Sequence, residues 1–253
     1  MIAVIEGVED ISMTTNASML TRERARSLRA AGLKRINISL DALDEKTFQR
    51  VNDVEFPVGR VLQGIEHAQA AGFDSVKINA VIRRGLNEHS VLHLADHFRG
   101  TDIILRFIEF MDVGSTNQWQ FDEVVSARQM ADIIHAEFPI APVSPNYHGE
   151  VAKRWRYLDG AGEVGFIASV TEPFCGDCAR ARLSAVGKVY TCLFATKGYD
   201  LRDLIREGAS DKALTRRIHT IWANRVDRYS ELRSRTSATV NRTQRVEMSH
   251  IGG

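Results

Sequence analysis

The sequence has 253 residues and a mass of 28.3 kDa, which is enough for one α/β barrel or two ordinary domains. Its 44% hydrophobic and 26% charged residues exclude a disordered, collagen-like or coiled-coil chain. The 33 basic and 32 acidic residues leave a net charge of +1, and no apolar run matches a membrane span or a signal peptide, so we expect a cytoplasmic protein with no membrane or nucleic-acid partner.

Short apolar strands alternate with helix-period segments in the first part of the chain. We predict strands at 10–15, 35–40, 75–81 and 103–109. Helical segments separate them, and Thr21 and Asn87 are expected to cap two of the helices. This repeat is typical of βα units around a parallel sheet.

The rhythm changes after Met111. Ser126 and Gln129 have the spacing of a capping box, which predicts a helix, and three prolines interrupt the chain between 139 and 145. We therefore place a domain boundary there, with domains at 1–140 and 141–253. In the second domain, antiparallel strands at 164–170 and 188–193 are expected around the cysteines, followed by helices at 200–207 and 211–225.

The ends of the four predicted strands are unusually polar. They carry Thr14, Ser39, Asp41 and Glu109, and Lys77 lies within the third strand. Ser39 and Asp41 have the residue types of helix caps, and Lys77 can extend its ammonium to solvent. Several polar side chains at the carboxyl ends of neighbouring strands are equally typical of a binding site.

All three cysteines fall in one short stretch, Cys175, Cys178 and Cys192, in the pattern C-x2-C-x13-C. Three thiolates and a fourth ligand such as His148 or Asp177 would complete a zinc site. The same thiolates would suit a 4Fe–4S cluster with one open iron, and a redox pair is a further alternative.

Arginines follow the cysteines. Arg180 and Arg182 have the fork geometry that suits phosphate oxygens, and in a strand they would point to the same face. From residue 213 onward, eight arginines stand against three acidic residues, which indicates either a surface for a polyanion or a solvated helix face with a basic tail.

Five stretches together resemble the radical-SAM GTP cyclases of molybdenum cofactor biosynthesis: 14–16, 35–42, 107–114, 175–183 and 251–253. The resemblance implies an α/β fold, a partial (β/α) TIM-like barrel truncated at its N-terminus, with a C-terminal α+β iron–sulfur subdomain. It implies a lyase that converts GTP to (8S)-3',8-cyclo-7,8-dihydroguanosine 5'-triphosphate. In that reaction a 5'-deoxyadenosyl radical from S-adenosylmethionine abstracts a ribose hydrogen, and the sugar carbon bonds to C8 of guanine.

The resemblance also implies residue roles. Cys175, Cys178 and Cys192 would hold a 4Fe–4S cluster whose open iron takes the guanine. GTP would contact Thr14, Lys77, Arg180, Ala181 and Arg182. Ser39 and Met111 would contact S-adenosylmethionine, and Gly252 and Gly253 would form a tail in the active site, where only residues without side chains fit. Family members tend to pair, so a homodimer is expected.

The sequence departs from the family pattern at two points. It has no cysteine before Cys175, so it lacks the C-x3-C-x2-C segment that binds the radical-generating cluster in the family. We therefore expect an incomplete N-terminus and an inactive chain. Ala17 stands where the family usually has glycine. The alternative function is a non-enzymatic module, stabilised by zinc, whose arginine-rich segment binds a protein or a nucleic acid.

Overall fold

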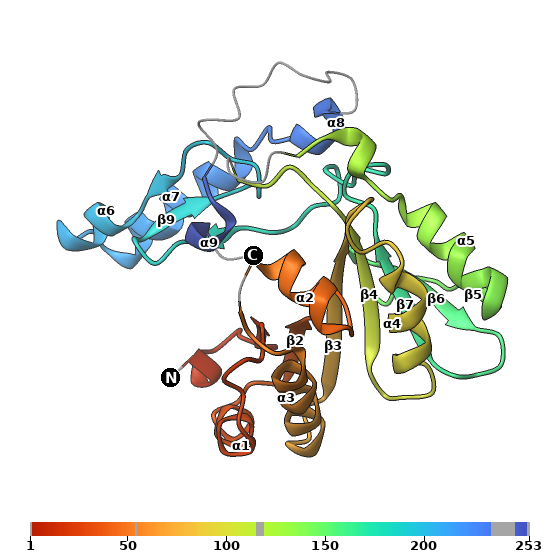
Figure 1. The fold of residues 1–253 in the computed structure, drawn as a ribbon. Coiled ribbons are helices and arrows are strands. Elements are labelled where there is room, and N and C mark those ends of the chain that lie inside the picture. The colour runs from red at the N-terminus through yellow and green to blue at the C-terminus, as the bar shows by residue number, and fades with distance from the viewer. Residues whose placement is uncertain (1, 54, 115–118, 234–245, 252–253) are drawn as a thin grey trace. The chain divides into compact units, whose positions relative to one another are not determined.

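The computed structural model describes residues 2–53, 55–114, 119–233 and 246–251, and Figure 1 shows its fold. The chain divides into two compact units. The first comprises residues 1–110 and 121–168, and the second comprises residues 111–120 and 169–253. In the described part of the chain, no helix is long and apolar enough to cross a membrane.

A seven-stranded sheet forms the centre of the first unit, in the order β1-β2-β3-β4-β7-β6-β5. Its strands are β1 (Ser12–Thr15), β2 (Arg35–Ser39), β3 (Ser75–Ile82), β4 (Ile104–Glu109), β5 (Ile140–Pro142), β6 (Lys153–Tyr157) and β7 (Glu163–Ile167). Pairing is parallel from β1 to β4 and between β4 and β7, and antiparallel at β7–β6 and β6–β5. Within the described residues the sheet is open, with β1 and β5 at its edges, which agrees with the expected partial barrel.

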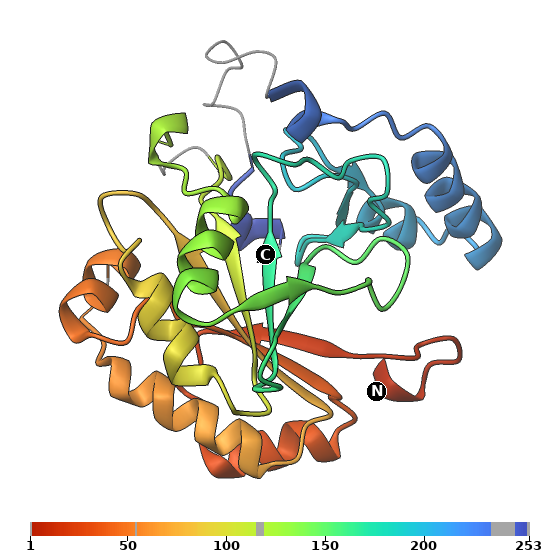
Figure 2. The ribbon, with the colours of Figure 1, turned by 90° about the vertical axis from the view of Figure 1, so that its right-hand side faces the viewer.

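Helices cover one face of this sheet (Figure 2). They are α1 (Arg22–Ala30), α2 (Glu45–Asn52), α3 (Val58–Ala70), α4 (Ser90–Phe98) and α5 (Ala127–Glu137), and two short 3-10 turns lie at η1 (Ile2–Val4) and η2 (Phe121–Glu123). The predicted cap at Thr21 is confirmed, because its side chain accepts a hydrogen bond from the Arg24 amide. The capping box of Ser126 and Gln129 at the start of α5 is confirmed too.

The prediction for Asn87 is wrong. The helix begins at Ser90 with His89 before it, and His89 makes no side-chain cap. Asn87 is fully buried, and its amide donates to the carbonyl oxygens of Asp41 and Val81. These buried backbone oxygens need a donor, since an unpaired buried polar group is costly, and Asn87 supplies it.

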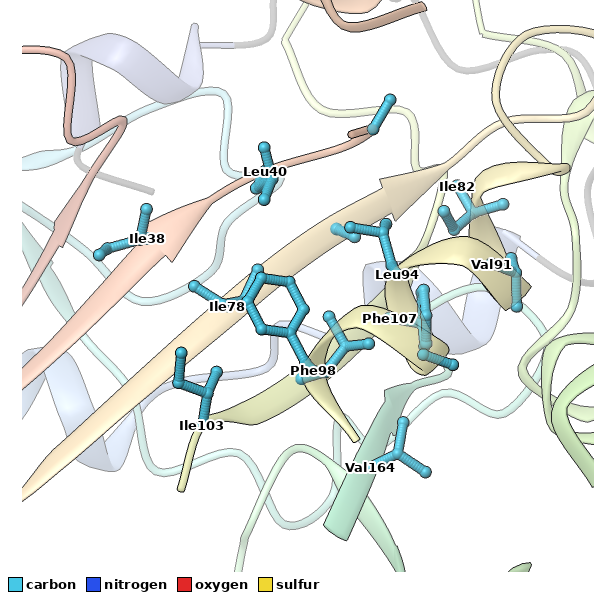
Figure 3. Close-up of a cluster of buried hydrophobic side chains, with 14 of the residues drawn as sticks. Ile38, Leu40, Ile78, Ile82, Val91, Leu94, Phe98, Ile103, Phe107 and Val164 are labelled. Atoms are coloured by element: carbon cyan, nitrogen blue, oxygen red, sulfur yellow. The ribbon is translucent and has the colours of Figure 1, made fainter. Parts of the chain in front are cut away.

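In strands β2, β3 and β4, buried side chains alternate with half-buried ones. The buried side chains are apolar except Glu109, and most of the half-buried ones are polar. Figure 3 shows the apolar set, in which Ile38, Ile78 and Phe107 lie with Leu94 and Phe98 of α4. Full burial of each such side chain contributes about 1.5–3 kcal/mol. The helices therefore take the apolar face, and the polar side chains of the same strands are left on the other face.

The second unit carries a three-stranded antiparallel sheet in the order β10-β9-β8, formed by β8 (Arg182–Leu183), β9 (Lys188–Tyr190) and β10 (Tyr199–Asp200). Its helices are α6 (Arg202–Arg206), α7 (Asp211–Ala223), α8 (Tyr229–Arg233) and α9 (Met248–Ile251). The strand predicted at 188–193 is confirmed as β9. The strand predicted at 164–170 forms β7, which pairs with β4 and β6 in the first unit and does not surround the cysteines.

The two units do not divide at residue 140. Residues 141–168 belong to the first unit, because β5, β6 and β7 continue its sheet. Residues 111–120, which follow β4, are grouped with the second unit.

Candidate functional site

Polar side chains from neighbouring parallel strands share one face of the first unit's sheet. The register aligns Thr14 of β1 with Asn37 of β2 and Asn37 with Lys77 of β3. The Asn37 amide lies 3.5 Å from the Thr14 hydroxyl. Thr14 and Lys77, which the family resemblance assigns to one ligand, thus lie on either side of Asn37.

Arg106 of β4 connects Asn37 of this face to Asn79, which lies two residues after Lys77 in β3. Its Nη2 donates to Asn37 Oδ1 at 2.8 Å, and its Nε donates to Asn79 Oδ1 at 2.9 Å. Gly165 of β7 lies opposite Arg106, and a Cβ there would come within 3.1 Å of the Arg106 side chain. Sequence analysis missed Arg106, although a charged residue inside the apolar run 103–108 is a usable signal, since strands buried on both faces are continuous hydrophobic runs.

This polar face is electropositive. Burial, together with the charges of Arg106, Arg35 and Arg154, lowers the pKa of Lys77, and the charge of Glu150 opposes the shift. Burial also lowers the pKa of Arg106. Cations held this close repel one another, and an anion on the same face would relieve that repulsion. The face is suited to phosphate.

A buried carboxylate connects the segment after β2 to strand β3. Asp41 Oδ1 accepts a hydrogen bond from the Val81 amide at 2.7 Å, and burial raises the pKa of Asp41 to about 6. Asp41 is therefore not a helix cap; Asp44 caps α2. Ser39, at the end of β2, is half-buried and is aligned with Asn79 of β3.

Met111 lies in the second unit, beside a buried ion pair. Ser169 Oγ is 3.7 Å from the Met111 sulfur. The next residue, Asp112, pairs with Arg233, and the two side chains are only 4% and 6% exposed. Arg233 also donates to the Ser169 carbonyl at 2.6 Å, so one guanidinium connects the residues that adjoin Met111.

The three cysteines are half-buried, and none forms a disulfide. The Cys178 amide donates to the Cys175 carbonyl at 3.4 Å, and Cys192 interacts electrostatically with Cys175. Arg182 interacts with both Cys178 and Cys192. In the residues that the structure describes, no three His, Cys, Asp or Glu side chains are arranged around a single metal ion, His148 and Asp177 included.

The environments of two thiols differ. Burial raises the pKa of Cys178. Hydrogen bonds and charge from Arg180, with a hydrogen bond from Arg225, lower it by more, so the net shift of the pKa is downward. Burial raises the pKa of Cys192, and Asp227 adds to the increase. Cys178 is thus the more readily ionised thiol of the two.

Arg180 and Arg182 do not share a strand face as predicted, because β8 begins only at Arg182. Arg180 and Ala181 are exposed, and the Arg180 guanidinium lies 5.2 Å from the Phe174 ring centroid. Arg182 is half-buried next to the cysteines. Gly252 and Gly253 lie outside the described residues, as do Arg235, Arg242 and Arg245.

Two family models match the chain. Residues 1–98 match the Radical SAM superfamily, and residues 103–231 match the family Molybdenum Cofactor Synthesis C. Among solved structures, a radical SAM methyltransferase from Sphaerobacter thermophilus is 15% identical, with a TM-score of 0.38 over 49% of this chain and 36% of that one.

Whole-chain relatives carry the name GTP 3',8-cyclase. The Xanthomonas campestris protein is 51% identical and covers 100% of this chain and 73% of its own length. The Acidothermus cellulolyticus protein is 49% identical, covering 100% of this chain and 76% of its own length, and the Staphylococcus epidermidis protein is 43% identical, with 99% and 73%. The chain therefore spans about three quarters of the length of these relatives.

Proposed function

Because this chain belongs to the GTP 3',8-cyclase family of radical-SAM enzymes, we propose that it binds GTP and S-adenosylmethionine for the cyclisation that begins molybdenum cofactor biosynthesis. The observation that carries the proposal is the 51% identity to a GTP 3',8-cyclase across the whole chain. The radical-SAM family implies a 4Fe–4S cluster and S-adenosylmethionine. The reaction forms a bond between a ribose carbon and C8 of guanine after one ribose hydrogen has been abstracted.

The first unit's polar face binds the nucleotide in this proposal. Lys77 provides the charge for a phosphate oxygen, and Thr14 provides a hydroxyl two strands away. Support comes from the lowered pKa of Lys77, since burial and the neighbouring cations outweigh the opposing charge of Glu150. Arg106 orients Asn37 and Asn79 and adds to the same positive charge.

S-adenosylmethionine contacts Ser39 and Met111 in this proposal. Ser39 offers a hydroxyl at the carboxyl end of β2, the end at which ligands bind in open α/β sheets. Met111 follows β4, and its side chain is supported by Ser169. These two assignments rest on family membership, and the local geometry is compatible with each.

Cys175, Cys178 and Cys192 are the ligands that we assign to a C-terminal 4Fe–4S cluster. Support comes from the electrostatic interaction of Cys192 with Cys175 and of Arg182 with Cys178 and Cys192, since three neighbouring thiolates are the ligands that such a cluster needs when one iron stays open. When bound, the cluster supplies an open iron for the guanine. Arg180, Ala181 and Arg182 then form the adjoining GTP contacts, with Arg182 nearest to the thiols.

Gly252 and Gly253 complete the assignment as a tail that enters the active site. The 253 residues contain no cysteine before Cys175. We therefore predict that this chain alone binds GTP but yields no cyclised product.

Two measurements test the proposal. Calorimetry with GTP on the iron-loaded chain should show binding that Lys77→Ala weakens by roughly tenfold or more, the factor expected when a charged contact is lost. Lys46→Ala, an exposed lysine on α2, is the matched control and should bind GTP like the wild type. Equal affinity in all three proteins would contradict the assignment of Lys77. Product formed by the chain in the presence of GTP, S-adenosylmethionine and a reductant would contradict the prediction of inactivity.

A further inference from the structure

Arg225 lies in the segment that follows α7 and contacts the loop that carries Cys178, the first of two arms of the cysteine site. Arg225 Nη1 donates a hydrogen bond to the Cys178 carbonyl, and the same guanidinium contributes to the lowered pKa of the Cys178 thiol. The side chain is only 13% exposed, and its Cζ lies 4.9 Å from the centroid of the Trp222 ring. The guanidinium is therefore held in one orientation, against the loop that carries Cys178.

Two residues further on, Asp227 contacts the second arm, the segment that carries Cys192. Its Oδ2 accepts a hydrogen bond of 2.5 Å from the hydroxyl of Thr191, the residue before Cys192. Thr191 is 4% exposed, so its hydroxyl is shielded from water, whereas the Asp227 side chain is 30% exposed. The same Oδ2 lies 3.7 Å from Arg225 Nε, which makes the two side chains an ion pair.

One short hairpin connects these two arms through the backbone. The pairing of β8 with β9 aligns Arg182 with Tyr190 and Leu183 with Val189, and the Ser184 amide donates to the Lys188 carbonyl at the turn. The cysteines form no disulfide. A short ladder leaves loops free to spread, whereas hydrogen bonds to charged groups hold their partners more strongly than neutral ones.

We propose that Arg225 and Asp227 form a clip that positions Cys178 and Cys192 for the C-terminal cluster and sets the electrostatic field there. The inference rests on the proposed function. Arg225 places a positive charge at the Cys178 side, and Asp227 places a negative charge at the Cys192 side. Neither is a ligand; both are positioning residues, and both also act on the cluster through their charge.

The two charges predict opposite effects on reduction. Reduction adds an electron to the cluster, so a nearby positive charge favours the reduced form and a nearby negative charge disfavours it. Arg225→Gln should therefore make the midpoint potential more negative. Asp227→Asn, which keeps an oxygen acceptor for Thr191, should make it less negative. If the two residues only supported folding, their variants would not shift the midpoint potential in opposite directions.

The experiment uses the full chain, loaded anaerobically with iron and sulfide. Iron loss to a chelator and the midpoint potential are measured for the wild type, Arg225→Gln, Arg225→Lys, Asp227→Asn and Arg228→Gln. Arg228 is the matched control, because it is exposed on the same segment and pairs with Glu231 instead. We expect Arg225→Gln to lose iron roughly tenfold faster, as for one lost hydrogen bond to a charged group, and Arg225→Lys to restore the potential.

The outcomes separate this inference from the proposed function. A wild-type chain that takes up no iron overturns both. An iron-loaded wild type whose potential and iron loss are unchanged in Arg225→Gln and Asp227→Asn overturns only the clip. If Arg225→Gln does not fold, Asp227→Asn decides by itself, since a potential that does not become less negative in this nearly isosteric variant refutes the electrostatic role.

Discussion

A methyl group added at Gly64 tests the contact that holds the turn after β1. Gly64 lies in α3, and a Cβ there would come 2.8 Å from both the Cβ and the carbonyl oxygen of Ala17. Ala17 cannot move away easily. It is 1% exposed, and its carbonyl accepts the Leu20 amide at 3.0 Å. Its φ is 54°, a left-handed conformation that favours glycine.

Two opposing effects set the magnitude of Gly64→Ala. Replacing glycine by alanine inside a helix stabilises it by about 1 kcal/mol. Forcing an extra methyl group into a packed site costs roughly 1–3 kcal/mol, and disturbing the Ala17 turn adds about 1 kcal/mol for its hydrogen bond. We therefore expect a net loss of roughly 1–3 kcal/mol in the free energy of unfolding. Gly59 lies in the same helix with no atom within 4 Å of its Cβ position, so Gly59→Ala should be stabilising.

Urea unfolding followed by circular dichroism measures both variants. Gly64→Ala should unfold at lower urea than the wild type, and Gly59→Ala at higher urea. The second change Ala17→Gly should restore part of the loss, because it removes one of the two close contacts and relieves the left-handed φ. If Gly64→Ala were as stable as Gly59→Ala, the packing argument would be refuted.

Three further predictions concern buried charge and the cysteine site. The pKa of Asp41 is about 6 in the folded chain against an ordinary 3.8, so this carboxyl contributes stability that is fully present below pH 3.8 and is lost as the pH rises through about 6. Asp41→Asn should remove this pH dependence, which amounts to roughly 3 kcal/mol in the free energy of unfolding. Urea unfolding at pH 4 and pH 7.5 measures it, and an equal pH dependence in the wild type and the variant would refute the reasoning. Arg180→Ala and Arg182→Ala should each weaken GTP binding in calorimetry and leave the iron content unchanged; unaltered affinity would remove their assigned role. In chains reconstituted without oxygen, iron and sulfide analysis should find about four irons per wild-type chain and none held stably in Cys175→Ala, whereas one zinc and no iron would favour a structural site.

The alternation of strands and helices was predictable because it depends on local periodicity. The strands at 35–40, 75–81 and 103–109 match β2, β3 and β4 to within one or two residues. The caps at Thr21 and Ser126 depend on residues three positions away, and both were predicted correctly. Asn87 was misread as a cap, and a cap was one of the two interpretations of Asp41. The Asn87 amide donates to the Asp41 carbonyl 46 positions away, and the Asp41 carboxylate accepts from the Val81 amide 40 positions away. Residue type alone does not distinguish a cap from a buried polar anchor.

The same limit applies to the arginines of the second unit. Charge patterning placed Arg225 and Arg233 in a solvated or polyanion-binding segment, but both side chains turn inward. Their partners, Cys178 and Asp112, are 47 and 121 positions away, so no local pattern could have indicated them. Burying an arginine costs desolvation, which its hydrogen bonds offset in part. Arg225 binds the Cys178 carbonyl and Arg233 binds Asp112, the residue after Met111, while the Nε of each makes no hydrogen bond within the described residues. The arginines in buried pairs therefore lie beside the assigned ligand contacts. The charge pattern describes only exposed arginines such as Arg228 correctly.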